Sequence, residues 1–277
     1  MSSAVTEGSN AATGPIIELE RATKRFLSGR GEVHVAVSEL TLSVRPGEFI
    51  AVVGPTGCGK STTLSLVSGL EPSSEGSVRV AGTEVNGIPD RIGYMFQADA
   101  LMPWRTVLGN VSAGLKWRGD KVDALAKARD WIGRVGLSGF EDYYPHQLSG
   151  GMRKRVALAQ VLVTEPHILL MDEPFSALDV QTRALMQDEL LRLWQGSGTA
   201  VVFVTHDLEE AITLADRVVV MTASPARIKE VFDIGLARPR QVEELRVEPD
   251  FIELYKQIWS CLSDEVAIAR REAVGVN

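Results

Sequence analysis

The chain is poor in cysteine, has no excess of positive charge and contains no long apolar run. A disulfide between its two distant cysteines, Cys58 and Cys261, would tether a glycine-rich loop, so we expect a reducing, cytoplasmic environment. The formal net charge of -7 argues against nucleic acid as a main partner. No stretch approaches the roughly 18–20 apolar residues that cross a bilayer. Residues 1–15 have neither the basic n-region nor the apolar h-region of a secretory signal, and they are predicted to form a disordered tail.

Residues 54–61 match the phosphate-binding pattern G-x-x-x-x-G-K-[ST]. An apolar run at 49–53 precedes them and a helically spaced segment at 61–70 follows, as the pattern requires. The glycines let backbone N–H groups turn toward an anion at the positive end of that helix. Lys60 would contact the β- and γ-phosphates, and the Ser61 hydroxyl would serve Mg²⁺. The expected nucleotide contacts of this loop are Gly54, Pro55, Thr56, Gly57, Cys58, Gly59, Lys60, Ser61 and Thr62.

The alternative interpretation of this loop is a glycine-rich turn with a solvated lysine, which the flanking strand and helix disfavour. We therefore predict that the chain binds a nucleoside triphosphate. Cys58 has two interpretations that the sequence leaves open. Its thiol is either acidified beside Lys60 at a helix N-terminus, and so easily alkylated, or it is buried and inert.

Two acids follow the apolar run at residues 168–171. This order places Asp172 at the carboxyl end of a strand, where α/β sheets bind ligands. Asp172 would hold Mg²⁺ through water, and Glu173 would act as general base on the attacking water. Alone, two acids after a strand more often form a solvated turn. The phosphate loop upstream makes the metal-binding and catalytic interpretation the favoured one.

A second anion site is predicted at residues 148–152, Leu-Ser-Gly-Gly-Met, which open a helix. Ser149 is a suitable N-cap, and Gly150 and Gly151 expose backbone N–H groups at the helix N-terminus. An ordinary capped helix start is the alternative. Two phosphate sites for one triphosphate require a further explanation.

The remaining pattern predicts an α/β fold. Short alternating segments predict antiparallel strands at 16–19, 33–37, 40–44 and 77–80. Apolar runs predict buried parallel strands at 49–53, 168–171, 199–204 and 217–221. Helical spacing between these runs, at 180–194 and 207–215, predicts a parallel sheet that is covered on both faces.

More than a hundred residues separate the phosphate-loop strand from the strand at 168–171, so a subdomain is inserted between them. Its predicted helices lie at 106–115, at 121–135, where Val122 belongs to the apolar stripe, and at 151–163. A last helix begins at Pro249, and packing on its own domain is favoured over binding a partner. Its apolar stripe contains Phe251, Leu254, Tyr255, Ile258, Leu262 and Val266.

These motifs, in this order, resemble the nucleotide-binding subunit of ATP-binding cassette (ABC) transporters over about residues 16–237. The resemblance implies a P-loop NTPase core with a parallel sheet, an antiparallel β subdomain and an inserted helical subdomain at about residues 97–165. The nucleotide-binding domain would span residues 16–240, and residues 241–277 would form a C-terminal helical extension.

The resemblance also implies roles for individual positions. Residues 54–61 match the Walker A loop, residues 168–173 the Walker B strand and residues 148–152 the signature motif. Gln97 matches the Q-loop, a sensor of Mg²⁺ and the γ-phosphate. Residues 176–179, ending at Asp179, match the D-loop.

Two further positions match less specific elements of the family. His206 matches the H-loop, although a strand-end histidine satisfied by backbone is the alternative. Phe26 stands where the family stacks an aromatic ring on adenine, although an edge-strand core residue is the alternative. The implied catalytic residues are Glu173, His206, Gln97 and Lys60, and the implied metal ligands are Ser61, Gln97 and Asp172.

A head-to-tail dimer is implied, with ATP and Mg²⁺ between the Walker A loop of one copy and Ser149, Gly150, Gly151 and Asp179 of the other. This arrangement explains the two anion sites of each chain. Three positions depart from the usual pattern, because Met152, Lys154 and Gln160 stand where the family commonly has Gln, Gln and Arg. The glycines and Ser149 are intact, so catalysis is expected to survive these departures.

The Pro103-Trp104 pair beyond Gln97 is similar to the ATPases of nitrate, sulfonate and taurine importers. Leu101, Met102 and Trp104 would lie near a groove that receives a membrane permease, although ordinary subdomain packing is the alternative. Such an importer works at the cytoplasmic face of the membrane, with a permease and a periplasmic or extracellular solute-binding protein. The alternatives are a soluble ABC ATPase in translation or DNA repair, and a regulator that does not hydrolyse its nucleotide.

Overall fold

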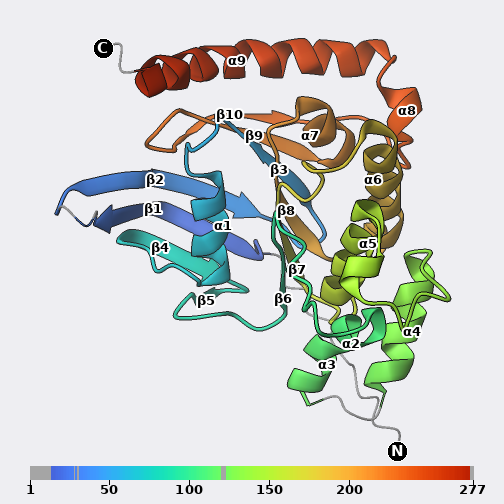
Figure 1. Cartoon of the computed structure of the whole chain (residues 1–277). Helices are drawn as coiled ribbons and strands as arrows, with labels where there is room; N and C mark the ends of the chain where they lie inside the picture. The colour runs from blue at the N-terminus through green and yellow to red at the C-terminus, as the bar shows by residue number, and fades with distance from the viewer. Residues whose placement is uncertain (1–13, 28, 30, 120–122, 275–277) are drawn as a thin grey trace, which may run out of the picture.

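A central sheet organises the computed structural model, which describes residues 14–27, 29, 31–119 and 123–274 (Figure 1). Within those residues the sheet has six strands in the order β10-β9-β3-β8-β7-β6. Neighbouring strands pair in parallel except for β10, which runs antiparallel to β9, so the predicted parallel sheet is confirmed. The strands are β3 (Phe49–Val53), β6 (Ile92–Met95), β7 (Ile168–Asp172), β8 (Ala200–Val204), β9 (Arg217–Met221) and β10 (Ile228–Asp233).

Side chains alternate along the central strand β3 and fill a core on each face of the sheet. Phe49, Ala51 and Val53 join one cluster, whereas Ile50 and Val52 join another. The first cluster also takes side chains from α5 (Gly150–Leu162), α6 (Val180–Trp194), α7 (Leu208–Leu214) and α9 (Pro249–Val274). The second takes them from α1 (Lys60–Ser68) and from a second sheet. Both faces are therefore covered, as predicted.

The second sheet is antiparallel and has the strand order β2-β1-β4-β5. Its strands are β1 (Ile17–Leu27), β2 (Val33–Val44), β4 (Glu75–Val80) and β5 (Thr83–Glu84). The prediction of separate strands at 33–37 and 40–44 is wrong. Glu39, at φ +49°, lies at an irregularity in the pairing with β1 that does not end the strand.

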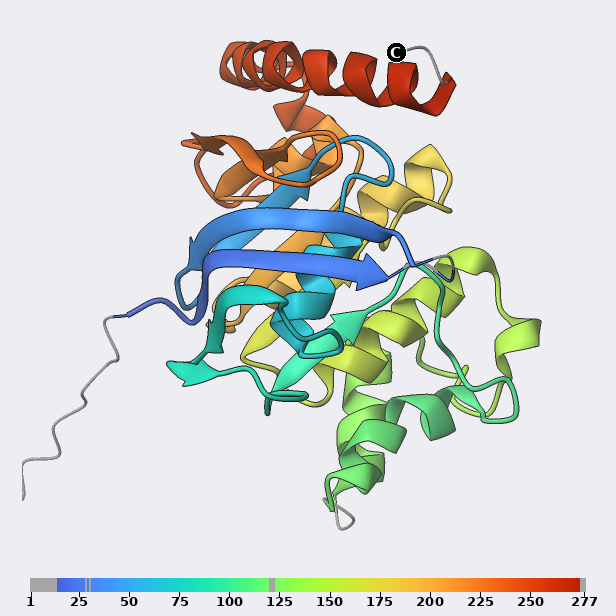
Figure 2. The same cartoon turned by 90° about the vertical axis from the view of Figure 1, so that its left-hand side faces the viewer.

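The segment between β6 and β7 is mainly helical and lies to one side of the sheets (Figures 1 and 2). The helix predicted at 106–115 is interrupted at Ser112, and Val122 of the next predicted helix lies outside the described residues. Its elements are α2 (Val107–Val111), α3 (Ala113–Trp117), α4 (Ala124–Arg134), the 3₁₀ turn η1 (Pro145–Gln147) and α5. The four α-helices among them share a third apolar cluster that includes Val111, Ile132 and Val156. The predicted boundaries at 97, 165 and 240 remain predictions.

After α8 (Val242–Leu245), the long helix α9 crosses the molecule above β9, β10 and α7 (Figures 1 and 2). Phe251, Ile258 and Leu262 are buried in the first core cluster, so α9 packs on its own chain, which is the favoured interpretation. Tyr255 does not join that cluster and is 36% exposed. The apolar stripe is thus narrower than predicted.

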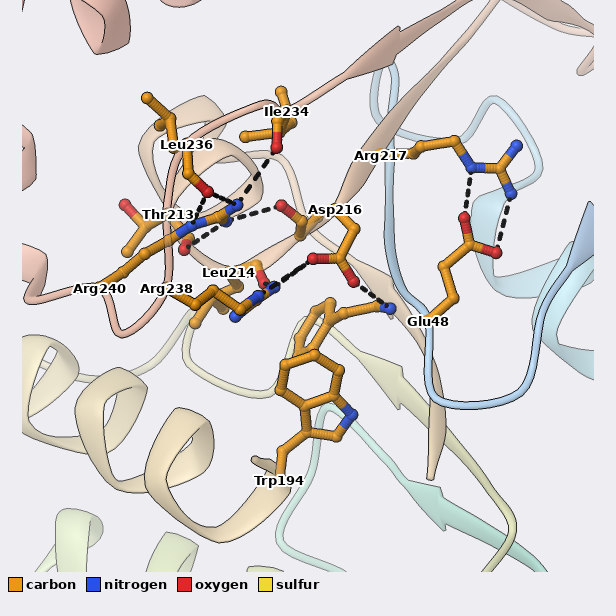
Figure 3. A network of polar contacts seen from close by, with 12 residues as sticks. Glu48, Trp194, Thr213, Leu214, Asp216, Arg217, Ile234, Leu236, Arg238 and Arg240 are labelled. Carbon is orange, nitrogen blue, oxygen red and sulfur yellow. Dashed lines mark hydrogen bonds and ion pairs between the residues drawn. The ribbon is translucent and has the colours of Figure 1, made fainter. Parts of the chain in front are cut away.

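A polar network joins the C-terminal segment to the core beside Trp194 (Figure 3). Asp216 accepts hydrogen bonds from Arg238 and from the backbone N–H of Phe49 at 2.7 and 2.9 Å. The buried Arg240 guanidinium donates to backbone carbonyls at the end of α7 and in the segment after β10. Burial lowers the pKa of Arg240 to about 10, so it stays charged at neutral pH. The network holds α7, whose N-cap follows His206, in a fixed place.

Candidate functional site

Four neighbouring parallel strands bring candidate residues to one edge of the central sheet. β3 leads into the loop at 54–59, β6 leads to Gln97, β7 ends at Asp172, and β8 leads to His206. Because the strands are parallel and adjacent, their carboxyl ends meet at a shared edge. Residues spread over more than a hundred positions therefore face a single cavity.

The cavity at this edge has a volume of about 540 Å³. It contains eleven of the predicted nucleotide, metal and catalytic residues and two that were not predicted, His34 and Ala36. The predicted residues in its wall are Phe26, Thr56, Gly57, Gly59, Lys60, Ser61, Thr62, Gln97, Asp172, Glu173 and His206. Three predicted contacts of the loop, Gly54, Pro55 and Cys58, are buried and do not line this cavity.

The loop surrounds the ammonium group of Lys60, and Lys60 as a residue is only 5% exposed. Lys60 Nζ donates to the carbonyl oxygens of Gly54 and Pro55 at 2.9 and 2.8 Å. Gly59, the N-cap of α1, has φ +119°, and a Cβ there would lie 2.5 Å from the Ala36 carbonyl oxygen. Only glycine fits this position, so the chain can turn sharply into α1.

Ser61 and Asp172 meet on one side of the cavity. The Ser61 hydroxyl donates to Asp172 Oδ1 at 3.0 Å. Burial raises the pKa of Asp172 above its usual value, the Ser61 hydrogen bond opposes this, and the nearby Glu173 adds to the increase. A carboxylate that is partly desolvated beside a second acid favours the approach of a cation.

Glu173 lies at the cavity wall with a contact to His206. Glu173 Oε2 is 3.1 Å from His206 Nδ1, and the His206 side chain is 58% exposed. The backbone N–H of Glu173 donates to the carbonyl of Val204, and its carbonyl accepts from Ser176. The backbone of Glu173 is therefore fixed while its carboxylate faces the cavity. His206 thus contacts the carboxylate predicted to act as base, and its assignment to the H-loop stays a prediction.

The remaining predicted contacts line a different cavity, of about 480 Å³, beside the start of α5. Ser149 Oγ accepts from the Met152 N–H at 3.2 Å and caps α5, as predicted. Asp179 accepts from the Thr182 N–H at 3.0 Å and caps α6. A Cβ on Gly151 would lie 2.7 Å from the Thr182 side chain, so α5 and α6 approach closely here. The predicted members of this second cavity are Ser149, Gly150, Gly151 and Asp179.

Comparison with known proteins decides the family. Residues 37–176 match the family model described as ABC transporter. An uncharacterized ABC transporter ATP-binding protein of Methanocaldococcus jannaschii, MJ0412, is 48% identical over 90% of this chain and 92% of its own length. The chain belongs to the ABC transporter family.

Other members extend this relationship. An aliphatic sulfonates import ATP-binding protein of Bacillus anthracis, SsuB, is 40% identical to this ABC ATPase over 81% of this chain and 88% of its own length. Among solved structures, the ATP-binding cassette MJ0796, a dimer with ADP and phosphate bound, is 30% identical with a TM-score of 0.70. That alignment covers 80% of this chain and all of the solved chain. The fold is thus the α/β P-loop NTPase fold, and the activity is ATP binding and hydrolysis.

The structure bears on two questions that the sequence left open for this ABC ATPase. Cys58 is 2% exposed, and burial raises the pKa of its thiol in spite of the nearby Lys60. Both observations favour the buried interpretation over the acidified one. Phe26 lies in the cavity wall outside the described core clusters, with Lys24 Nζ 4.9 Å from its ring centroid. Its ring is available to a planar ligand.

His34 and Ala36 were missed because their place depends on strand pairing. His34 lies opposite Phe26 in the antiparallel register of β1 and β2, which turns it toward the same cavity. Recognising residues 17–27 and 33–44 as one hairpin would have found it.

Of the departures from the usual motif, Met152 packs against the helical cluster. Among the described residues, none of the helices is long and apolar enough to span a membrane.

Proposed function

We propose that this ABC ATPase drives an importer for a small anionic or zwitterionic solute of the nitrate, sulfonate or taurine type. Support comes from the relatives named as aliphatic sulfonates import ATP-binding proteins, about 40% identical over most of both chains. The Pro103-Trp104 pair, which is typical of this importer group, points the same way. Solute choice belongs to the permease and the solute-binding protein, so this chain supplies the energy and they supply the specificity.

The triphosphate would lie along the loop at 54–61 with its base against Phe26. There, backbone N–H groups and Lys60 would bind the phosphates. Mg²⁺ fits the site because Ser61 and Asp172 already bring hard oxygen atoms to 3.0 Å from each other beside Glu173. Gln97 would complete this ligand set. When bound, the ion neutralises developing charge on the phosphoryl group.

Hydrolysis needs a base at the γ-phosphate, and Glu173 is the candidate. Its carboxylate faces the cavity and can orient and deprotonate a water molecule. His206, 3.1 Å away, would fix the carboxylate and contact the same phosphate. Lys60 is expected to leave its two carbonyl partners for the phosphates.

The catalytic unit would be a head-to-tail dimer. One cavity of this chain contains the phosphate loop, whereas Ser149, Gly150 and Gly151 line another. A second copy would bring its own Ser149 to the γ-phosphate, so that a symmetric pair has two complete sites. The dimeric cassette with ADP and phosphate supports this arrangement. Loss of the shared phosphate would then separate the halves.

A permease would bind near residues 101–104. The buried Asn110 accepts from the Met102 N–H at 2.7 Å and donates to the carbonyls of Met102 and Arg105, which fixes the loop. Trp104 projects from this fixed loop and is 73% exposed. An exposed aromatic ring on a rigid loop is typical of a protein contact. The ATPase would thereby be held at the cytoplasmic face of the membrane, opposite the solute-binding protein.

The test is a nucleotide-dependent dimer. Glu173→Gln should bind ATP, hydrolyse it at least about a hundredfold more slowly and elute as a dimer in gel filtration with ATP and Mg²⁺. Lys60→Ala is the matched control and should neither bind ATP nor dimerise. An elution volume of Glu173→Gln that ATP leaves unchanged would contradict the shared site. Recovery of the wild-type chain from membranes without a permease would contradict the importer assignment.

A further inference from the structure

Lys154 is buried in the first turns of α5, although its ammonium group carries a charge. Its side chain is 4% exposed. Nζ donates to the backbone carbonyl of Gln97 at 2.7 Å and lies 3.1 Å from Asp99 Oδ1. A buried ammonium group is stable only when polar partners replace the water molecules that would hydrate it. The Gln97 carbonyl and Asp99 are these partners, so Lys154 is held in one position. It fixes the peptide from which the exposed Gln97 side chain starts.

Asp99 joins this contact to the start of the signature helix. Its other carboxylate oxygen accepts from Arg153 Nε at 3.0 Å, and a second nitrogen of Arg153 donates to the Leu148 carbonyl at 2.8 Å. The next residue, Ala100, has φ +48°, a backbone conformation that tertiary contacts must maintain. The segment 97–100 and the turn that contains Ser149 are therefore tied together through side chains of α5.

These contacts connect the two cavities. Gln97 lines the cavity with Ser61 and Asp172, and Ser149 lines the cavity beside α5. Lys154 lines neither cavity, and its ammonium group contacts the Gln97 carbonyl and Asp99, so any effect on the nucleotide would pass through these two residues. A glutamine, which is usual in the family at this position, is shorter and lacks the charge for Asp99.

We propose that Lys154 is a positioning residue. It would hold the backbone of Gln97 so that the Gln97 side chain can contact Mg²⁺, and it would couple the position of Gln97 to that of Ser149. The inference rests on the proposed function, because it presumes that Gln97 senses the ion. In a dimer, the ion in one half-site would thereby influence the phosphate contact that the same chain offers to the other half-site.

The experiment is a Mg²⁺ titration of ATP hydrolysis with ATP binding measured separately without Mg²⁺. Lys154→Met should bind ATP within about twofold of wild type, because no phosphate contact is lost. Its kcat should fall about tenfold and its half-saturating Mg²⁺ concentration should rise severalfold, as expected when a group behind a metal ligand is removed. Lys154→Arg, which keeps the charge and a donor, should recover much of the loss.

Arg153→Met is the matched control, because it removes a cation that binds Asp99 but not Gln97. It should leave the Mg²⁺ requirement close to that of wild type. An unchanged Mg²⁺ curve for Lys154→Met, or an equal shift in Arg153→Met, would overturn the assignment to Lys154. If circular dichroism shows that Lys154→Met is unfolded, Lys154→Gln takes its place in the same comparison.

Failure of the inference is distinguishable from failure of the proposed function. A wild-type chain that neither hydrolyses ATP nor responds to Mg²⁺ would contradict the proposed function itself. Normal wild-type hydrolysis together with an unchanged Lys154→Met titration would remove only the role of Lys154.

Discussion

Glu173 combines an unusual backbone conformation with a central place in the cavity. Its φ is +43°, in the left-handed region that non-glycine residues rarely adopt. Such a conformation costs about 1 kcal/mol or more and persists only where surrounding contacts hold it. Here the Val204 carbonyl and Ser176 supply those contacts. The backbone conformation turns the carboxylate away from the line of β7 and toward His206.

Cys58 is expected to resist alkylation. Its thiol is 2% exposed, and burial raises its pKa, so the reactive thiolate is scarce at neutral pH. At about pH 7.5, iodoacetamide should label Cys58 at least about tenfold more slowly than the partly exposed Cys261, measured on peptides by mass spectrometry. A Cys261→Ser variant isolates the slow reaction. Rapid labelling of Cys58 that ATP suppresses would restore the acidified interpretation.

At the residue scale, the sequence could predict the groups that bind phosphate but not those that hold them. Lys60, Asp172 and Glu173 stand in short motifs whose spacing is set by one strand and one turn. The contact between Lys154 and the Gln97 carbonyl joins positions 57 residues apart and has no local pattern. Only the packing of α5 beside the end of β6 brings them together.

At the scale of elements, helix α9 is attached to the core by a buried acid as well as by its apolar face. Glu265 accepts from the backbone N–H of Ala223 at 2.8 Å and lies 2.9 Å from Lys229 Nζ. Burial alone would raise the pKa of Glu265, but these two partners outweigh it and the pKa is lowered. The ionised form is therefore the one that the folded chain stabilises.

Glu265→Gln should destabilise the chain in a pH-dependent way. A folded-state pKa below the ordinary glutamate value of 4.5 means that the stabilisation is fully present above pH 4.5 and is lost as pH falls through the folded-state pKa. At neutral pH the loss should be about 1–3 kcal/mol in urea unfolding, shrinking in acid. Asp264→Asn, whose acid is 78% exposed and 3.7 Å from Lys229, is the control and should change little. A difference between Glu265→Gln and wild type that is independent of pH would contradict this account.

Helices and strands with a clear apolar periodicity in their own sequence were predictable. Those whose residues are explained only by packing against other elements were not. Helix α6 occupies the residues predicted from its apolar spacing, 180–194. Strand β6 was missed because it has only four residues and contains Gly93, which suggests a turn. A Cβ on Gly93 would lie 2.5 Å from Val161 of α5, so this glycine serves close packing under a strand. That requirement is visible only in three dimensions.

At the scale of the whole molecule, the two cavities and the Trp104 loop all depend on the helical segment between β6 and β7. Gln97 begins this segment, the second cavity lies at its last helix, and Trp104 stands between them in the sequence. Leu101 packs against both the sheet core and the helical cluster. A movement of this segment would therefore shift Trp104 and Ser149 together, as the proposed coupling to a permease needs.

Under the proposed importer function, Trp104→Ala should uncouple the ATPase from the permease while leaving the isolated subunit active. The ring is 73% exposed and its loop is held by Asn110, so truncation removes a contact surface without opening the core. Loss of an aromatic anchor at an interface costs about 2 kcal/mol or more, so permease-stimulated hydrolysis in proteoliposomes should fall about tenfold or further. Trp259→Ala, which removes a 47% exposed ring on α9, is the matched control. If Trp259→Ala abolished the stimulation and Trp104→Ala did not, the permease would have to bind at α9.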